Sequence, residues 1–156
     1  MNENTSPRTI LVPVDFSETS KRGLHQAGLL AQKLDCRLEL LRVLEFNPVH
    51  YAPLAAGSWY TRESIDKVHQ ELREMAERFL PEGLVAETNV VIGPDASRTI
   101  VERAGEIGAE LIVMGTHSRS GLAHFFLGST AEAVVRHAPC PVMTVGPERE
   151  SAQQAA

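Results

Sequence analysis

Short apolar runs alternate along this chain with stretches that repeat apolar residues every three or four positions. The runs are rich in Val, Ile and Leu, which is typical of strands buried on both faces, and the stretches between them fit amphipathic helices. Alternating strands and helices require parallel strands joined by right-handed crossovers. We therefore expect a single doubly wound α/β domain with helices on both faces of a parallel sheet, its strands lying at residues 9–14, 37–44, 84–92, 111–114 and 142–145.

Helix start and stop signals lie between these runs. Ser17 and Asp95 are suitable N-cap residues for the first and third helices. Residues 45–60 have no helical or strand period, and two interpretations stay open for them: a lid over a ligand, or a surface excursion whose aromatic side chains pack locally. The helices are expected at residues 17–34, 62–80, 95–108 and 130–137.

Composition limits the domain size, the partners and the cellular compartment that we expect for the chain. The chain has 156 residues, enough for a sizeable core, and we expect a domain over residues 9–146 with flexible tails at 1–8 and 147–156. Lys and Arg number 15 against 20 Asp and Glu and form no basic run, which argues against nucleic acid as a partner. No window approaches the ~20 apolar residues of a membrane span, so no membrane insertion is expected. Cys36 and Cys140 have no metal-ligand spacing and suit reduced thiols in the cytoplasm.

A loop rich in glycine and hydroxyl side chains follows the fourth strand. Glycine lets backbone N–H groups approach an anion closely, hydroxyls donate hydrogen bonds, and the first turn of a helix has unpaired N–H groups at the positive end of its dipole. Asp15 follows the first strand, and the carboxyl ends of parallel strands share one edge of the sheet. We expect this edge to bind a nucleotide through Asp15 together with Gly115, Gly128, Ser129 and Thr130.

Other interpretations of these residues stay open. Asp15 alternatively ends its strand and supports the turn into the first helix, while Ser129 and Thr130 alternatively cap the last helix without a ligand. His117 and His124 have no third ligand nearby, so no metal site is expected. Neither GxxxxGK[ST] nor GxGxxG occurs where a P-loop hydrolase or a dinucleotide oxidoreductase needs it, and no nucleophile context points to a catalytic residue.

Three motifs in order carry a resemblance that covers nearly the whole chain. They are Val12-Pro13-Val14-Asp15, then Val113-Met114-Gly115-Thr116-His117, then Leu127-Gly128-Ser129-Thr130. With this set the chain resembles the universal stress protein family. The resemblance implies an adenine nucleotide alpha hydrolase-like sheet in the order 3-2-1-4-5, homodimerisation through the last strand (Val142 to Val145) and, in one branch of the family, an ATP site.

The resemblance also assigns roles to single positions. Val14 and Asp15 match the residues that hold the ribose and adenine end, and Val43 matches a residue that lines the adenine pocket. One departure concerns Ser118, which stands where ATP-binding members carry glycine; its side chain can crowd the phosphates or donate a hydroxyl to them. The resemblance does not assign a role to Arg119; its place in the loop leads us to expect that it contacts the phosphates. The nucleotide-binding candidates are Pro13, Val14, Asp15, Val43, Met114, Gly115, Ser118, Arg119, Gly128, Ser129 and Thr130.

The resulting expectation is an intracellular, dimeric stress-response module that binds ATP, alone or with Mg²⁺. Little or no hydrolysis is expected, because the phosphate loop contains no lysine and no evident water-positioning base. Two alternatives belong to other classes. One is a nucleotide-free dimeric interaction protein, and the other is a slow ATP hydrolase or transferase that uses Asp15.

Overall fold

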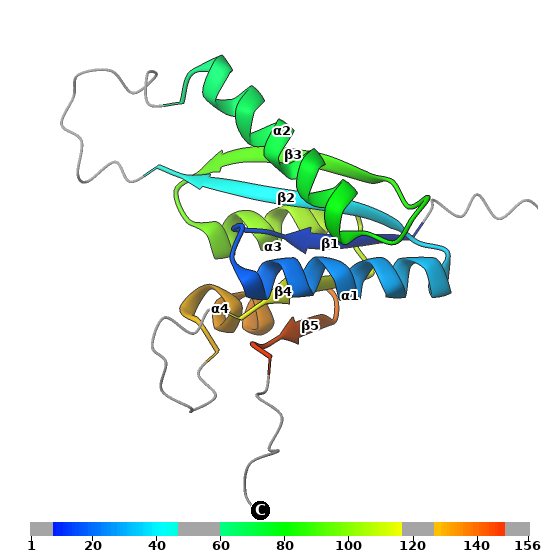
Figure 1. The fold of residues 1–156 in the computed structure, drawn as a ribbon. Coiled ribbons are helices and arrows are strands. Elements are labelled where there is room, and N and C mark those ends of the chain that lie inside the picture. Colours follow the sequence, from blue (N-terminus) through cyan, green and yellow to red (C-terminus); the bar gives the residue numbers. More distant parts are fainter. Residues whose placement is uncertain (1–7, 47–59, 117–126, 149–156) are drawn as a thin grey trace, which may run out of the picture.

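The computed structural model describes residues 8–46, 60–116 and 127–148, which form a 5-stranded sheet with helices on both sides (Figure 1). The strand order is β3-β2-β1-β4-β5, and every pair of neighbouring strands is parallel. The expected doubly wound α/β architecture and the 3-2-1-4-5 order are therefore confirmed. The elements are β1 (Thr9–Pro13), α1 (Glu18–Leu34), β2 (Arg37–Glu45), α2 (Arg62–Phe79), β3 (Ala86–Gly93), α3 (Ala96–Glu106), β4 (Leu111–Gly115), α4 (Ser129–His137) and β5 (Val142–Val145).

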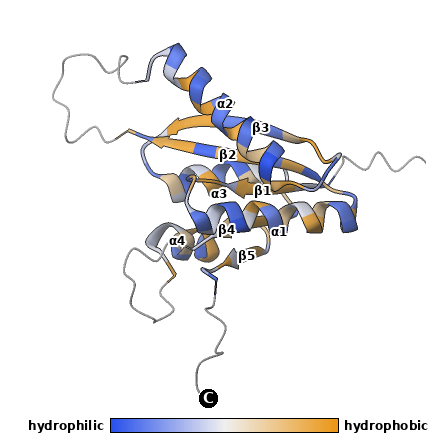
Figure 2. Ribbon diagram, viewed as in Figure 1, coloured by the Kyte–Doolittle hydropathy of each residue, from blue (hydrophilic) through white to orange (hydrophobic). Residues whose placement is uncertain are grey.

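Two layers of helices bury the sheet. Side chains of β1 alternate between the layers: Ile10 and Val12 pack with α1 and α2, whereas Leu11 packs with α3 and α4. Figure 2 shows the matching pattern of hydropathy, with strands that are largely hydrophobic and helices that carry polar residues on their outer sides. Burial on both faces explains why the strand sequences are nearly continuous apolar runs.

The helix boundaries agree closely with the sequence, with one informative difference. The Ser17 hydroxyl accepts a hydrogen bond from Ser20 N at 3.2 Å, and Asp95 Oδ1 accepts one from Arg98 N at 2.8 Å, so both expected N-caps are confirmed. The last helix begins at Ser129, one residue earlier than expected, and its N-cap is Gly128.

The start of α4 lacks the side-chain cap that one interpretation predicted. No side chain of the described residues caps this helix, so the interpretation in which Ser129 and Thr130 serve as its caps is wrong. Other differences at element ends are small: β2 continues to Glu45, and β3 begins at Ala86 rather than at residue 84. Most of the segment 45–60, for which a lid was one interpretation, lies outside the described residues. None of the described helices is long and apolar enough to cross a membrane.

Candidate functional site

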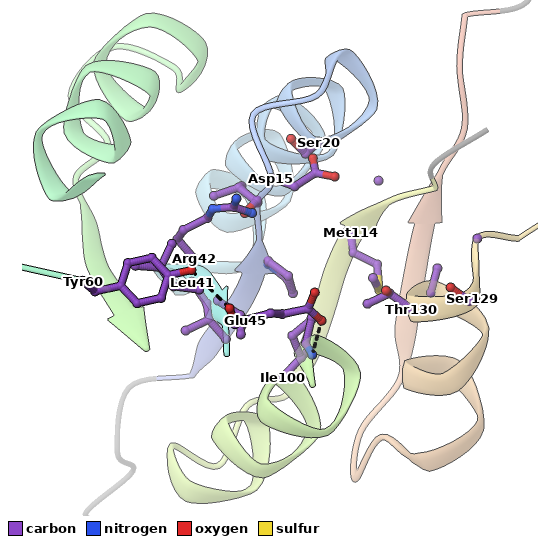
Figure 3. Close-up of a pocket in the computed structure, with 18 residues that line it drawn as sticks. Asp15, Ser20, Leu41, Arg42, Glu45, Tyr60, Ile100, Met114, Ser129 and Thr130 are labelled. Atoms are coloured by element: carbon purple, nitrogen blue, oxygen red, sulfur yellow. Dashed lines mark hydrogen bonds between the residues drawn. The ribbon is translucent and has the colours of Figure 1, made fainter. Parts of the chain in front are cut away.

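A cleft of about 700 Å³ opens at the carboxyl ends of β1, β2 and β4. The strand order reverses direction between β1 and β4, and ligands of doubly wound sheets bind outside the strands at such a reversal. The first turns of α3 and α4 supply the remaining walls. Figure 3 shows the side chains that point into this space from the strand ends and the two helices.

The predicted residues that lie in the described part of the chain all border this cleft. Their functional roles remain predictions, because a residue can line a cleft without contacting a ligand. Ser118 and Arg119 lie outside the described residues. The predicted residues that line the cleft are Pro13, Val14, Asp15, Val43, Met114, Gly115, Gly128, Ser129 and Thr130.

Asp15 supports a turn and borders the cleft at the same time. Its Oδ1 accepts hydrogen bonds from Ser17 N at 3.0 Å and from Ser17 Oγ at 2.5 Å, which fixes the step from β1 into α1. Its side chain is exposed and lines the cleft. The turn-supporting interpretation and the ligand-binding one are thus compatible, because one carboxylate presents several acceptor positions.

Gly115 is a glycine for a reason that the sequence did not suggest. A Cβ atom at this position would lie 2.5 Å from the carbonyl carbon of Thr19 and 2.6 Å from the backbone N of Ser20. The close approach of α1 to the end of β4 therefore excludes any side chain. The same contact continues at Gly23, whose Cβ would lie 3.2 Å from Gly115 N.

The first turn of α4 forms the polar wall opposite Arg42. The N–H groups of its first turn lie at the positive end of the helix dipole, and no side chain among the described residues caps them. The Ser129 and Thr130 side chains lie beside these donors at the edge of the cleft. Such an arrangement favours an anionic group of a ligand.

The floor of the cleft is apolar. Leu41 and Val43 come from β2, Met114 from β4 and Ile100 from α3, and each side chain is at most 7% exposed. A flat, largely apolar group such as a nucleobase suits this surface, whereas the helix terminus suits charge.

Several lining residues were missed by the sequence analysis. Tyr60 donates a hydrogen bond from its hydroxyl to Glu45 O at 3.1 Å, and Glu45 Oε1 accepts one from Ala96 N at 2.9 Å. Arg42 lies next to them on β2. Arg42 and Glu45 follow from one overlooked signal: in a parallel sheet the end of β2 lies beside the end of β1, so its last residues border the same cleft. Tyr60 lies just before α2, and no sequence signal places it there.

The cleft carries both acidic and basic side chains. Within the described residues its ionisable side chains are Asp15, Arg42, Glu45 and Tyr60, and no histidine, lysine or cysteine lines it. No group of three or more His, Cys, Asp or Glu that suits a metal ion occurs in that part of the chain either. His117 and His124 fall outside it.

Comparison with known proteins gives consistent results. The family model described as universal stress protein family matches residues 7–146. The chain is 33% identical over 143 residues to universal stress protein MJ0531 of Methanocaldococcus jannaschii, covering 88% of this chain and 81% of that protein. The structure matches a universal stress protein from Archaeoglobus fulgidus with a TM-score of 0.67 at 21% identity, over 90% and 98% of the two chains. It also matches a universal stress protein in complex with cAMP, with a TM-score of 0.63 at 26% identity, over 92% and 100%. The chain belongs to the universal stress protein family.

Proposed function

We propose that the cleft binds an adenine nucleotide, with ATP, alone or with Mg²⁺, as the physiological ligand. One observation carries this proposal: an apolar floor, an exposed carboxylate and a helix N-terminus that no described side chain caps surround a single space. A nucleotide presents the same three chemistries in order, a flat base, hydroxyls that donate hydrogen bonds, and phosphates.

Each part of the cleft matches one part of the ligand. Val43 and Ile100 offer an apolar surface to adenine, and the Asp15 carboxylate accepts hydrogen bonds from the ribose hydroxyls. The N–H groups around Gly128 and Ser129 donate to the phosphates. Ser118 and Arg119 remain proposed phosphate contacts from the loop that joins β4 to α4. The related protein solved with cAMP supports the choice of an adenine nucleotide.

We assign to the complex a regulatory role, in a cytoplasmic homodimer, rather than turnover. The described cleft offers no lysine or histidine to stabilise phosphoryl transfer or to activate water. Nucleotide occupancy would then alter stability or partner contacts. The dimer is proposed to form through β5, the strand at the edge of the sheet beside β4.

Titration calorimetry with ATP and Mg²⁺ tests the binding. Wild-type protein should bind ATP, and Asp15→Asn should weaken binding about tenfold by removing a charge-assisted hydrogen bond while keeping an acceptor for Ser17. Glu110→Gln is the control, because Glu110 is an exposed carboxylate at the amino end of β4, away from the cleft. Folded protein that gives no heat at millimolar ATP would contradict the proposal.

Two further measurements separate the alternatives. Mass analysis of small molecules released from purified protein should find an adenine nucleotide; its absence, with no heat on titration, would favour a nucleotide-free interaction protein. Release of phosphate from ATP should stay at background. Steady release that Asp15→Asn abolishes would instead favour the slow hydrolase.

A further inference from the structure

Arg42 is the only arginine or lysine among the described residues that line the cleft. Its guanidinium makes two contacts with the turn that joins β1 to α1. Nη1 donates a hydrogen bond to Val14 O at 3.5 Å, and Cζ lies 5.6 Å from the centroid of the Phe16 ring. Figure 3 shows the Arg42 side chain reaching toward this turn and Asp15.

The two contacts lie on either side of Asp15. Val14 precedes Asp15 and Phe16 follows it, so the guanidinium contacts the turn one residue before and one residue after the carboxylate. Phe16 has φ of 65°, a left-handed conformation that residues other than glycine rarely adopt. Such a conformation persists only when surrounding contacts support it, and it is frequent at ligand sites.

We propose that Arg42 is a positioning residue that clamps this turn and thereby holds the Asp15 carboxylate at the cleft before a ligand arrives. The ring face of Phe16 attracts the cation, and the Val14 carbonyl fixes the direction of the guanidinium. For its binding consequences, the inference rests on the proposed nucleotide site.

A direct contact between Arg42 and the phosphates is the competing role for this cation. The proposed phosphate end of the cleft is the first turn of α4, and Ser129 and Thr130 lie across the cleft from Arg42 in Figure 3. The two roles predict different ligand dependence. A clamp acts through Asp15 and therefore on any ligand with a ribose, whereas a phosphate contact acts only on ligands that carry phosphate.

Arg42→Met tests the clamp with two ligands, adenosine and ATP. The variant should bind both about tenfold more weakly than wild type, the equivalent of about 1.4 kcal/mol for each. Arg37→Met is the matched control, because Arg37 is an exposed arginine at the opposite end of the same strand. A loss confined to ATP, or no loss for either ligand, would overturn the inference.

A readout without nucleotide separates this inference from the proposed function. The Ser17 amide donates to Asp15 Oδ1, so in Arg42→Met its hydrogen exchange should become several-fold faster, while the midpoint of global unfolding stays near that of Arg37→Met. If wild-type protein binds neither ligand, the proposed function fails and Ser17 exchange alone decides the clamp. Unchanged exchange at Ser17 would overturn it.

A second variant tests the contact between Arg42 and the Phe16 ring directly. Phe16→Leu preserves an apolar side chain at the turn but removes the ring face that Arg42 contacts. If the two residues act together, the effect of the double variant on Ser17 exchange should be smaller than the sum of the two single effects. Additive effects would show that the ring and the guanidinium act independently, and the clamp as proposed would be wrong.

Discussion

Arg103 of α3 binds Glu39 of β2 through both carboxylate oxygens, from Nε to Oε1 at 2.7 Å and from Nη2 to Oε2 at 3.0 Å. The Glu39 side chain is only 5% exposed, and Asn89 Nδ2 also donates to Oε1, at 3.3 Å. This charge pair therefore connects the interior of the sheet to the helix whose first turn borders the cleft. It also explains how a carboxylate is tolerated within an apolar strand, since a buried charge needs a partner.

Removing the arginine should destabilise the fold strongly. Arg103→Met leaves the Glu39 carboxylate buried without its partner, and we expect the free energy of unfolding to fall by about 3 kcal/mol or more. Arg98→Met is the control on the same helix, because its pair with Glu102 is exposed and screened by solvent, so that its loss should change stability little. Urea unfolding followed by circular dichroism measures both. A loss for Arg103→Met no greater than that of the control would contradict the prediction.

This pair marks a limit of what the sequence could predict. The strand 37–44 was recognisable from its apolar residues, and the parallel direction of the strands followed from the alternation of strands and helices. Its neighbours in the sheet were implied only by the resemblance to the universal stress protein family. The partner of Glu39, in contrast, lies 64 residues away on another element, where no local pattern points back to it. Periodicity predicts which face of an element is buried, but not which charged side chains meet across two elements.

Gly115 should not tolerate even a methyl group. In Gly115→Ala the new Cβ would lie within 2.7 Å of three backbone atoms of Thr19 and Ser20, so α1 must shift away from β4. We expect a loss of about 1–3 kcal/mol in unfolding free energy, measured by thermal or urea unfolding. Gly105→Ala is the control: its Cβ meets nothing within 4 Å, and alanine should stabilise α3 by about 0.5–1 kcal/mol. Equal stability of Gly115→Ala and wild type would refute the packing argument.

The candidate site was predictable where a motif stands at the end of a strand or at the start of a helix. Asp15 and Gly128 belong to such motifs, and both line the cleft. Arg42 and Tyr60 border the same space, yet they stand out in no motif, because their position depends on strand order and on where α2 begins. The sequence also predicted only part of the role of Gly115, because its close contact with α1 depends on how the elements pack.

The stabilising effect of the Asp95 cap should depend on pH. The Ser97 hydroxyl and then the Arg98 backbone N–H hold the pKa of the Asp95 carboxyl below its ordinary value. A lowered folded pKa means that the carboxylate stabilises the fold above its unfolded pKa of about 3.9, and that this contribution is lost as the pH falls further through the folded pKa.

Asp95→Ala measures that contribution. At pH 7 the substitution should reduce the unfolding free energy by about 1 kcal/mol, and the difference from wild type should shrink below about pH 4. Urea midpoints at pH 7, 5 and 3 follow the change. Asp95→Asn, which keeps a capping oxygen, should lose less at pH 7. A gap between Asp95→Ala and wild type that stays constant down to pH 3 would exclude a charged cap.

The proposed dimer can be tested at a single backbone N–H group. Pro141 O and Val145 O accept hydrogen bonds from Ile112 and Thr116, so the alternate residue Thr144 directs its backbone groups toward the outer edge of β5. Proline is tolerated at an edge when its missing N–H faces outward. Thr144→Pro should therefore keep the fold yet dissociate a dimer that pairs through β5, whereas Thr144→Val, which keeps the N–H, should remain dimeric. Sedimentation equilibrium distinguishes these states. A folded Thr144→Pro protein with the mass of a dimer would mean that the subunits associate through another surface.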